Sequence, residues 1–203
     1  AIFENYISGC TSFVPFTSKI NVLGGGTPKT SESSYWGGDI PFFTPKDVVS
    51  PYTLNTEKHI TEAGLNHCNS KLYPTNTTFV TARGTVGKIA MAGVPMAMNQ
   101  SCYALASDSI DPILVYLYAG YAVSSLKHKA SGAVFDAIVT RDFETEQLPS
   151  LNKHEEAAIV DTISPMLECI RAQSMENMRL SELRDILLTK LMSGELDVSE
   201  IDL

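Results

Sequence analysis

Residues 152–192 read NKHEEAAIVDTISPMLECIRAQSMENMRLSELRDILLTKLM and run into Ser193-Gly194-Glu195-Leu196. The segment contains no glycine and is rich in Leu, Met, Glu, Arg and Ala, which favour helix. Its apolar residues recur three or four positions apart, the spacing of one helix face. The clearest examples are Leu180, Leu183, Leu187 and Leu191. The pattern predicts that the segment is helical.

Pro165 is the one interruption of this pattern. A proline inside a helix costs about 3 kcal/mol, but it is tolerated at a first helical position, and Ser164 before it is a good N-cap. We therefore expect a shorter helix over 152–163 and a long one over 165–192, ended by Gly194. At 1.5 Å per residue the second helix is a rod of roughly 42 Å. Its apolar stripe needs a partner, either another copy of the chain or a different subunit.

The composition is that of an ordinary globular protein, with 203 residues, 44% of them hydrophobic and 19% charged. No apolar run is long enough for a membrane span, and the first ten residues lack the basic flank and apolar core of a signal peptide. We therefore expect a cytoplasmic protein. The four cysteines lie far apart without metal-ligand spacing, which favours free thiols. The loosely spaced His59, His67 and Cys68 do not suit a tetrahedral metal site.

The net charge of −8 argues against a simple basic nucleic-acid binder, but its distribution weakens that argument. From Ser150 onward there are 5 basic and 11 acidic residues, whereas the range 71–132 carries 5 basic residues against 2 acidic ones. Local patches rather than totals govern electrostatic binding. The middle of the chain is therefore the place where an anionic partner is expected.

A polar cluster follows from the strands predicted in this middle part. Residues 79–81, 88–91 and 102–105 have the pattern of strands, and Gly84 and Gly87 bound a tight turn between the first two. The residues placed at this hairpin tip, or just before the next strand, are Thr81, Arg83, Thr85, Lys88, Asn99, Gln100 and Ser101.

These side chains suit contact with DNA, because Arg and Lys can pair with guanine, Asn and Gln with adenine, and Ser or Thr with base or phosphate. Polar hairpin tips are also common without any such role, so the cluster alone is a weak signal. We expect Arg83 and Lys88 to contact the DNA backbone more than the bases.

Further cations stand at predicted helix ends. Thr44-Pro45 is typical of a helix start and places Lys46 in the first turn, either as a phosphate contact or as an ordinary surface lysine. Asp111-Pro112 predicts the start of a packed helix over 113–126. Lys127 and Lys129 follow that helix, close to Ser131, and suit either a phosphate-binding loop or simple compensation of the helix dipole.

Two glycine-rich turns have plain structural interpretations. The run Gly24-Gly25-Gly26 is not a nucleotide-binding loop, because Pro28 precedes Lys29; it indicates positive φ angles or close backbone approach. Trp36, the only tryptophan, precedes a glycine pair and is expected to be an anchor rather than a base-stacking residue. The remaining expectations are a strand within 13–22, a helical turn over 61–63, a strand over 135–139 and an exit segment over 143–148.

Several of these motifs resemble the target recognition domain of the DNA specificity subunit of type I restriction-modification systems. The matching segments are Leu23–Thr30, Tyr35–Phe42, Thr44–Asp47, Ile60–Leu65, Ala82–Lys88, Met98–Leu105 and Leu187–Glu195. They cover nearly the whole chain in the family's order. The resemblance implies an α+β fold, with a target recognition domain over 1–149 and a long helical dimerisation and spacer region over 150–203 that pairs as an antiparallel coiled coil.

The resemblance also implies a subunit without catalysis or cofactor. In this family the specificity subunit binds double-stranded DNA, modification subunits methylate adenine using S-adenosylmethionine, and the restriction subunit hydrolyses ATP. The sequence agrees, because it contains no Asn-Pro-Pro-Tyr or Asp-Pro-Pro-Tyr motif and no nucleotide loop. Two alternatives stay open: a scaffold or interaction protein of the same fold that does not bind DNA, and an enzyme of another fold.

One departure from the family concerns copy number. Family members usually carry two recognition domains and two long helical regions, whereas this chain has one of each, as a natural half-subunit or part of a longer one. Two copies could rebuild the whole by two-fold symmetry, which predicts a homodimer that reads a bipartite inverted-repeat target. The expected rod contacts are Leu167, Ile170, Leu180, Leu183, Leu187 and Leu191, with Gln173 and Asn177 as polar interruptions.

Overall fold

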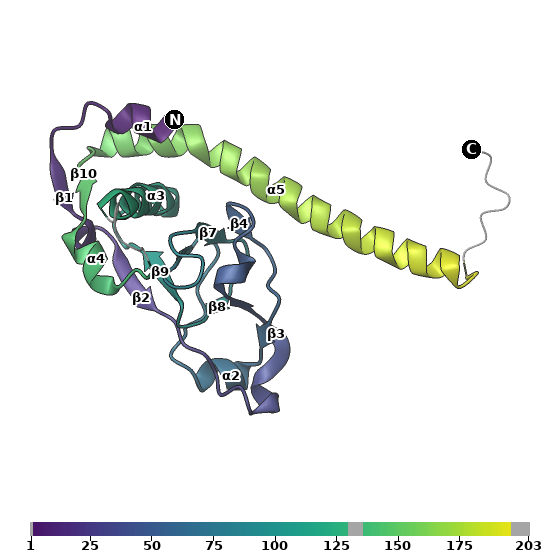
Figure 1. The fold of residues 1–203 in the computed structure, drawn as a ribbon. Helices are drawn as coiled ribbons and strands as arrows, with labels where there is room; N and C mark the ends of the chain where they lie inside the picture. The colour runs from purple at the N-terminus through teal and green to yellow at the C-terminus, as the bar shows by residue number, and fades with distance from the viewer. Residues whose placement is uncertain (1, 130–135, 196–203) are drawn as a thin grey trace, which may run out of the picture.

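The computed structural model describes residues 2–129 and 136–195, which form a mixed α+β domain and one long projecting helix (Figure 1). The helices are α1 (Ile2–Ile7), α2 (Glu62–Asn66), α3 (Pro112–Lys129), α4 (Thr140–Thr145) and α5 (Lys153–Met192), with 3-10 turns η1 (Phe16–Ser18), η2 (Ser33–Tyr35) and η3 (Pro45–Asp47). The strands are β1 (Phe13–Pro15), β2 (Asn21–Gly24), β3 (Trp36–Phe43), β4 (Tyr52–Thr53), β5 (His59–Ile60), β6 (Thr78–Thr81), β7 (Ile89–Ala92), β8 (Ala97–Met98), β9 (Cys102–Ala106) and β10 (Gln147–Pro149).

The central sheet has five strands in the order β2-β9-β6-β7-β4. Its neighbours are antiparallel except for β4, which runs parallel to β7. The strands expected over 79–81, 88–91 and 102–105 are confirmed as β6, β7 and β9, each within one residue at either end. The strand expected within 13–22 is split into β1 and β2 by η1.

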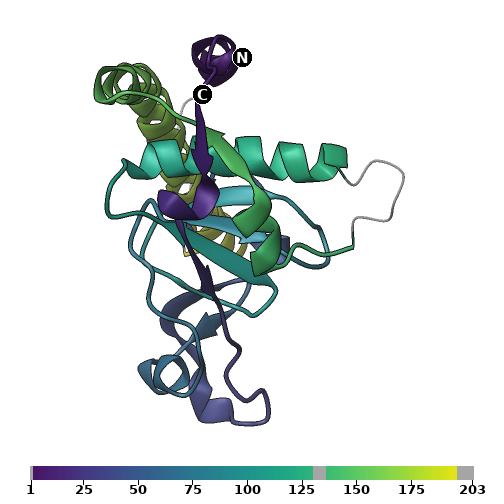
Figure 2. The same ribbon diagram turned by 90° about the vertical axis from the view of Figure 1, so that its left-hand side faces the viewer.

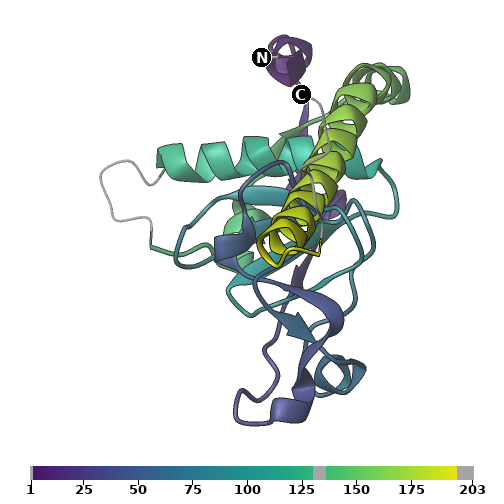
Figure 3. The ribbon, with the colours of Figure 1, turned by 90° about the vertical axis from the view of Figure 1, so that its right-hand side faces the viewer.

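Both faces of the central sheet are buried, which explains its apolar sequence. Alternate residues of a strand point to opposite faces, so Val80 packs with α3 while its neighbour Phe79 packs with Phe43 on the other side. Figures 2 and 3 show α3 lying across the sheet, and its Leu114 and Tyr118 belong to the same core as Val80. The opposite face meets the smaller sheet of order β5-β3-β8.

Close approach, rather than positive φ, explains the Gly24–Gly26 run. A Cβ on Gly25 would lie 2.1 Å from the backbone oxygen of Asn99, and one on Gly26 would lie 2.6 Å from the backbone nitrogen of Asn69. Neither glycine has a positive φ, although Gly84 and Gly87 at the β6–β7 turn do. The run therefore brings three chain segments together at the end of β2.

The region after α3 differs from its prediction. The helix itself starts as expected, because the Asp111 carboxylate accepts the Ile113 N–H at 2.8 Å. The strand expected over 135–139 is wrong where the structure describes it, since only Ala137 pairs, with Arg83. Val139 instead donates its N–H to Asp142 at 2.7 Å and precedes α4. That helix takes up the first half of the expected exit segment, and β10 takes up its last two residues. Phe135 lies outside the described residues.

The prediction of two helices around Pro165 is also wrong, because α5 is one helix of 40 residues with Pro165 inside it. The proline and Asp161, the residue four positions before it, are both exposed, so water can bond the carbonyl that loses its N–H partner. Ile159, Ile163 and Leu167 on the other face are buried in the main core and hold both sides of the proline in place. The helix spans roughly 60 Å.

Two polar contacts add to this apolar anchor of α5. Glu156, 5% exposed, accepts hydrogen bonds from Lys19 at 2.7 Å and Lys153 at 3.1 Å. Arg171 donates to the Gly93 backbone oxygen at 3.0 Å. Farther along, the helix projects from the domain (Figure 1). Its leucines from Leu180 onward are exposed.

Candidate nucleic-acid interface

The β6–β7 turn is held by side chains that the sequence placed among the DNA contacts. The Thr81 hydroxyl accepts the Lys88 N–H at 2.9 Å and donates to the Thr85 backbone oxygen. Lys127 donates from Nζ to the Gly87 backbone oxygen at 3.0 Å. Thr81 is completely buried, so it shapes the turn and is not accessible to a ligand, whereas Lys88 is exposed.

Five of the predicted residues surround one depression of about 400 Å³ beside this turn. We call it the basic depression; its lining residues are Thr44, Pro45, Lys46, Glu57, Lys58, Arg83, Gly84, Thr85, Asn99 and Ser101. They come from four segments of the chain: the η3 turn, the loop before β5, the turn after β6 and the turn before β9. The fold thus gathers Lys46, Arg83, Thr85, Asn99 and Ser101 as the sequence suggested.

The buried carboxylate of Asp47 joins two walls of the basic depression. It accepts the Thr44 N–H at 2.7 Å, the Thr44 hydroxyl at 2.7 Å and the Glu57 N–H at 3.0 Å. Lys46 directly precedes Asp47 in the sequence, and Lys58 directly follows Glu57. Their backbone positions are therefore set by one side chain, and the three-residue η3 adds no helix dipole of consequence.

The other walls are joined by backbone contacts. Thr85 donates its hydroxyl to the Pro45 oxygen at 3.2 Å, and Asn99 donates its N–H to the Phe43 oxygen at 3.0 Å. The Asn99 side-chain oxygen accepts the Ser101 N–H at 3.0 Å, which fixes the amide while leaving its NH₂ group with no hydrogen bond to another described residue.

Cations outnumber acids on this surface. Lys46, 82% exposed at its side chain, lies 3.9 Å from Glu57, a distance at which an exposed pair contributes little. Among residues 2–129 and 136–195, no carboxylate lies within ion-pair distance of Lys58, Arg83 or Lys88. Their charges are thus available to an anionic ligand.

The remaining predicted contacts are placed elsewhere. The Gln100 side chain pairs with the Thr27 hydroxyl outside the basic depression. Lys129 bonds to Glu146, whose carboxylate is buried, at 2.5 Å, so its charge is already compensated. Ser131 lies outside the described residues. Lys58 was missed, because nothing in its local sequence indicates that the loop before β5 folds against η3.

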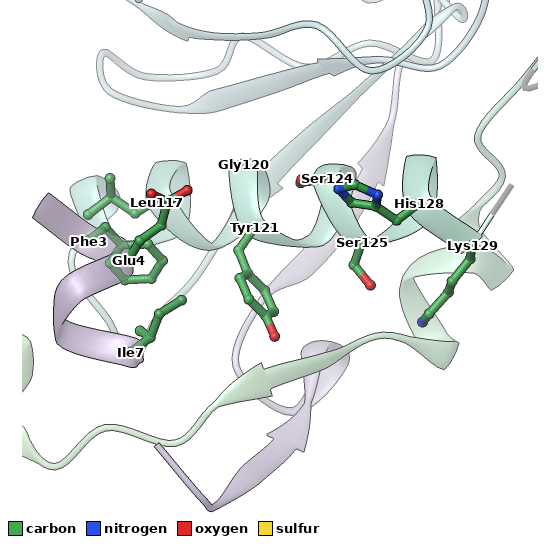
Figure 4. A pocket seen from close by; sticks show the side chains of 10 residues that line it. All are labelled: Phe3, Glu4, Ile7, Leu117, Gly120, Tyr121, Ser124, Ser125, His128 and Lys129. Atoms are coloured by element: carbon green, nitrogen blue, oxygen red, sulfur yellow. The ribbon is translucent and has the colours of Figure 1, made fainter. Parts of the chain in front are cut away.

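A separate hollow of about 580 Å³ lies between α1 and α3. Figure 4 shows Phe3 and Ile7 of α1 closing one end, with Leu117 and Tyr121 along α3 and His128 near its far end. It shares no lining residue with the basic depression.

The rod carries the apolar stripe expected of it in its second half. Leu180, Leu183, Leu187 and Leu191 are 40–52% exposed. Leu167, by contrast, is only 6% exposed in this chain's own core, and Ile170 packs against that core, so neither is free to meet a second helix. Further exposed apolar residues that the sequence stripe did not include are Met175, Met178, Ile186, Leu188 and Met192.

Residues 19–182 match the family described as the type I restriction modification DNA specificity domain. The chain belongs to this family. Its curated relatives are named specificity subunits, and a specificity subunit selects DNA without carrying a catalytic centre. Within the described ranges, no cluster of three or more His, Cys, Asp or Glu side chains is arranged to hold a metal ion, and no helix is long and apolar enough to cross a membrane.

Curated relatives of the chain come from an archaeon and from bacteria. The type I restriction enzyme MjaIX specificity subunit of Methanocaldococcus jannaschii is 29% identical over 77% of this chain and 38% of its own length. The HindI specificity subunit of Haemophilus influenzae is 26% identical over 86% of this chain and 39% of its own length. The chain thus spans less than half the length of these relatives.

Solved structures show the same fold. The HsdS subunit of Thermoanaerobacter tengcongensis aligns with a TM-score of 0.55 at 21% identity, over 91% of this chain and 45% of that one. The S subunit of the type I restriction-modification system from M. genitalium gives 0.63 at 14% identity, over 93% and 48%.

Proposed function

We propose that the chain binds double-stranded DNA through the basic depression and selects a specific sequence there. The observation that carries this proposal is the convergence of Lys46, Lys58 and Arg83 with Asn99 at one concave surface. Phosphate contacts fix the position of a protein on a duplex, while base-edge contacts supply specificity. The net charge of −8 does not oppose this, because the excess of acid lies on the rod.

The side chains divide into two roles within this proposal. Arg83 and Lys88 flank the β6–β7 turn as unpaired cations and are the contacts for the DNA backbone, with Lys46 across the depression. The Asn99 amide is held by the Ser101 N–H, and its NH₂ group and remaining lone pair match the edge of adenine. Thr85 and Ser101 add hydroxyl groups. Gln100 is a weaker candidate for a DNA contact, because its side chain pairs with Thr27 outside the depression.

We further propose that two copies pair through the exposed half of α5 as an antiparallel coiled coil. A helix that leaves its domain with a row of exposed leucines lowers its free energy by covering them, and spacings of three or four residues place these leucines on one face of the helix. Two-fold symmetry would hold two basic depressions at a fixed separation, so the target would be bipartite and inverted. The contacts retained for this dimer are Leu180, Leu183, Leu187 and Leu191.

The same proposal assigns residues 1–149 to target recognition and 150–203 to dimerisation and spacing. Modification subunits that methylate adenine, and through them the restriction subunit, would be directed to the chosen sequence in the cytoplasm. One structural neighbour, with a TM-score of 0.54 at 22% identity, comes from work on complex assembly and conformational transition of the type I R-M system. We propose that the present chain assembles with modification and restriction subunits in the same way.

Binding of short duplex DNA by the purified chain, measured by fluorescence anisotropy over a range of salt concentrations, tests the DNA-binding part. We expect salt-sensitive binding, and R83Q should weaken it and reduce the salt slope by about one. R179Q removes another exposed arginine, one on α5, and serves as the charge-matched control. If the wild-type protein assembles normally but binds no duplex at low salt, the DNA-binding proposal is wrong. The alternative of a scaffold that does not bind DNA would then be favoured.

A further inference from the structure

A second hollow lies beside the basic depression. It has a volume of about 510 Å³ and shares Glu57 and Lys58 with the depression. We call it the Trp36 hollow; its lining residues are Thr30, Trp36, Gly37, Gly38, Glu57, Lys58 and His59. The two hollows are thus neighbours, and Lys58 lines both of them.

The indole of Trp36 is fixed in this hollow by its surroundings. Its Nε1 donates to the Lys29 backbone oxygen at 3.3 Å, and its ring meets Phe42 edge-on at a centroid distance of 5.5 Å. The glycines beside it allow the backbones to close up, since a Cβ on Gly38 would lie 2.6 Å from the Ile60 oxygen. Gly37 has a φ of +77° at the irregular pairing of β3 with β5.

Lys58 stands over this ring, with its ammonium 5.9 Å from the ring centroid. Such a contact at an exposed site is weaker than a charge-assisted hydrogen bond to a phosphate oxygen. The ring therefore orients the ammonium without preventing it from taking an anion. Glu57 is the one carboxylate in either lining, and among the residues that the structure describes it forms no ion pair with Lys58.

We infer that the DNA backbone leaves the basic depression across Lys58 and continues over Trp36. Lys58 then binds a phosphate, and the indole packs against the adjoining deoxyribose, an arrangement that adds affinity and register without reading bases. The ligand is the sugar-phosphate backbone of duplex DNA. This inference rests on the proposed DNA-binding function and extends its surface beyond the hairpin tip.

Trp36 is the only tryptophan of the chain and reports on this site directly. The intact protein is titrated with short duplex DNA at low salt while acrylamide quenching of tryptophan fluorescence and the anisotropy of labelled DNA are followed together. We expect loss of acrylamide quenching at the DNA concentration where anisotropy shows saturation. Saturated binding with unchanged acrylamide quenching would overturn the inference, while absence of binding would count against the proposed function instead.

The K58Q variant gives an independent test with R179Q as its control. Removing one phosphate contact should lower the salt slope of binding by about one, whereas R179Q should keep the wild-type slope. Retained tryptophan emission and an unchanged unfolding midpoint show that K58Q is folded. If folded K58Q keeps the wild-type salt slope while R83Q lowers it, Lys58 does not bind a phosphate. The inference would then be wrong, and the DNA contacts would be limited to the β6–β7 turn.

Discussion

At the scale of single residues, buried side chains hold the backbone segments that carry the cations of the proposed interface. Asp47 fixes the walls that hold Lys46 and Lys58, and Thr81 fixes the turn that holds Arg83 and Lys88. Because Gly25 has no side chain, the chain after β2 can pack directly against the backbone of Asn99. The cations of the basic depression thus owe their positions to neighbours that never meet the ligand.

Replacing Asp47 by Ala should leave the Thr44 and Glu57 N–H groups without their acceptor. These two hydrogen bonds are part-buried, so the loss should lie toward the lower end of the roughly 1–3 kcal/mol that an unsatisfied buried group costs. We expect a lower unfolding midpoint in urea and weaker duplex binding, because Lys46 and Lys58 lose their support. D47N, which retains one acceptor oxygen, should recover part of both. Wild-type stability in D47A would show that the carboxylate is not what joins the two walls.

Gly25 and Gly24 form a matched pair for the close-approach interpretation. The G25A methyl group would collide with the Asn99 backbone, and such overpacking typically costs about 1–3 kcal/mol. The G24A methyl group meets nothing within 4 Å and should change the free energy of unfolding little. Urea denaturation of both variants checks this, and equal stabilities would contradict the proposed crowding at Gly25.

At the scale of elements, α5 acts as an anchor in its first half and as a rod in its second. The anchor depends on Ile159, Ile163 and Leu167 and on the buried Glu156, and Pro165 is carried within it. Because the helix continues through the proline, the anchor and the exposed leucines belong to one rigid element. The direction of the exposed second half of α5 is therefore set by the packing of its first half against the domain.

P165A tests the continuity of α5. If the residue lies inside a continuous helix, alanine restores the lost hydrogen bond and should stabilise the protein by up to about 3 kcal/mol. If it instead began a separate helix, alanine would lose a favourable first-turn residue and bring no gain. Thermal unfolding followed by circular dichroism distinguishes the two, with A172G as a control for helix propensity.

Glu156 should make the anchor sensitive to acid. Burial alone would raise its pKa, but the hydrogen bonds and charges of Lys19 and Lys153 outweigh that and hold the pKa below its ordinary value of 4.5. A carboxyl whose pKa is lowered by folding adds stability above its unfolded pKa and loses it as the pH falls through the folded pKa. E156Q should therefore be less stable at neutral pH, with the difference from wild type shrinking below pH 4.5. A difference that is independent of pH would contradict this role.

Much of the element list follows from sequence, because α3, the strands around the β6–β7 turn and the helical C-terminal segment have clear periodicities. Periodicity does not say which surface a stripe meets, so Leu167 was assigned to a partner although this chain buries it. Polar residue type likewise says nothing of burial, as Thr81 shows. Lys58 and the partner of Lys129 depend on contacts between distant segments, which no local pattern encodes.

At the scale of the whole molecule, the proposed dimer depends on the exposed leucines of α5. L183E should place a charge in the proposed helix pair and convert the dimer to a monomer, because a charge buried without a partner is costly. V49K adds a charge at an exposed valine outside the rod and should leave the dimer intact. Sedimentation equilibrium measures both, and a monomeric wild type over the working concentrations would exclude pairing through the rod.

The most direct test of the central claim is to express this chain with its neighbouring modification subunit in a host that lacks adenine methylation and to sequence the genome for modified adenines. We predict a bipartite inverted-repeat motif, because two copies related by two-fold symmetry would present identical basic depressions. R83Q in the same system should reduce methylation of that motif. A complex that assembles but leaves no methylated motif would contradict sequence reading by this chain, and an asymmetric motif would contradict the symmetric dimer.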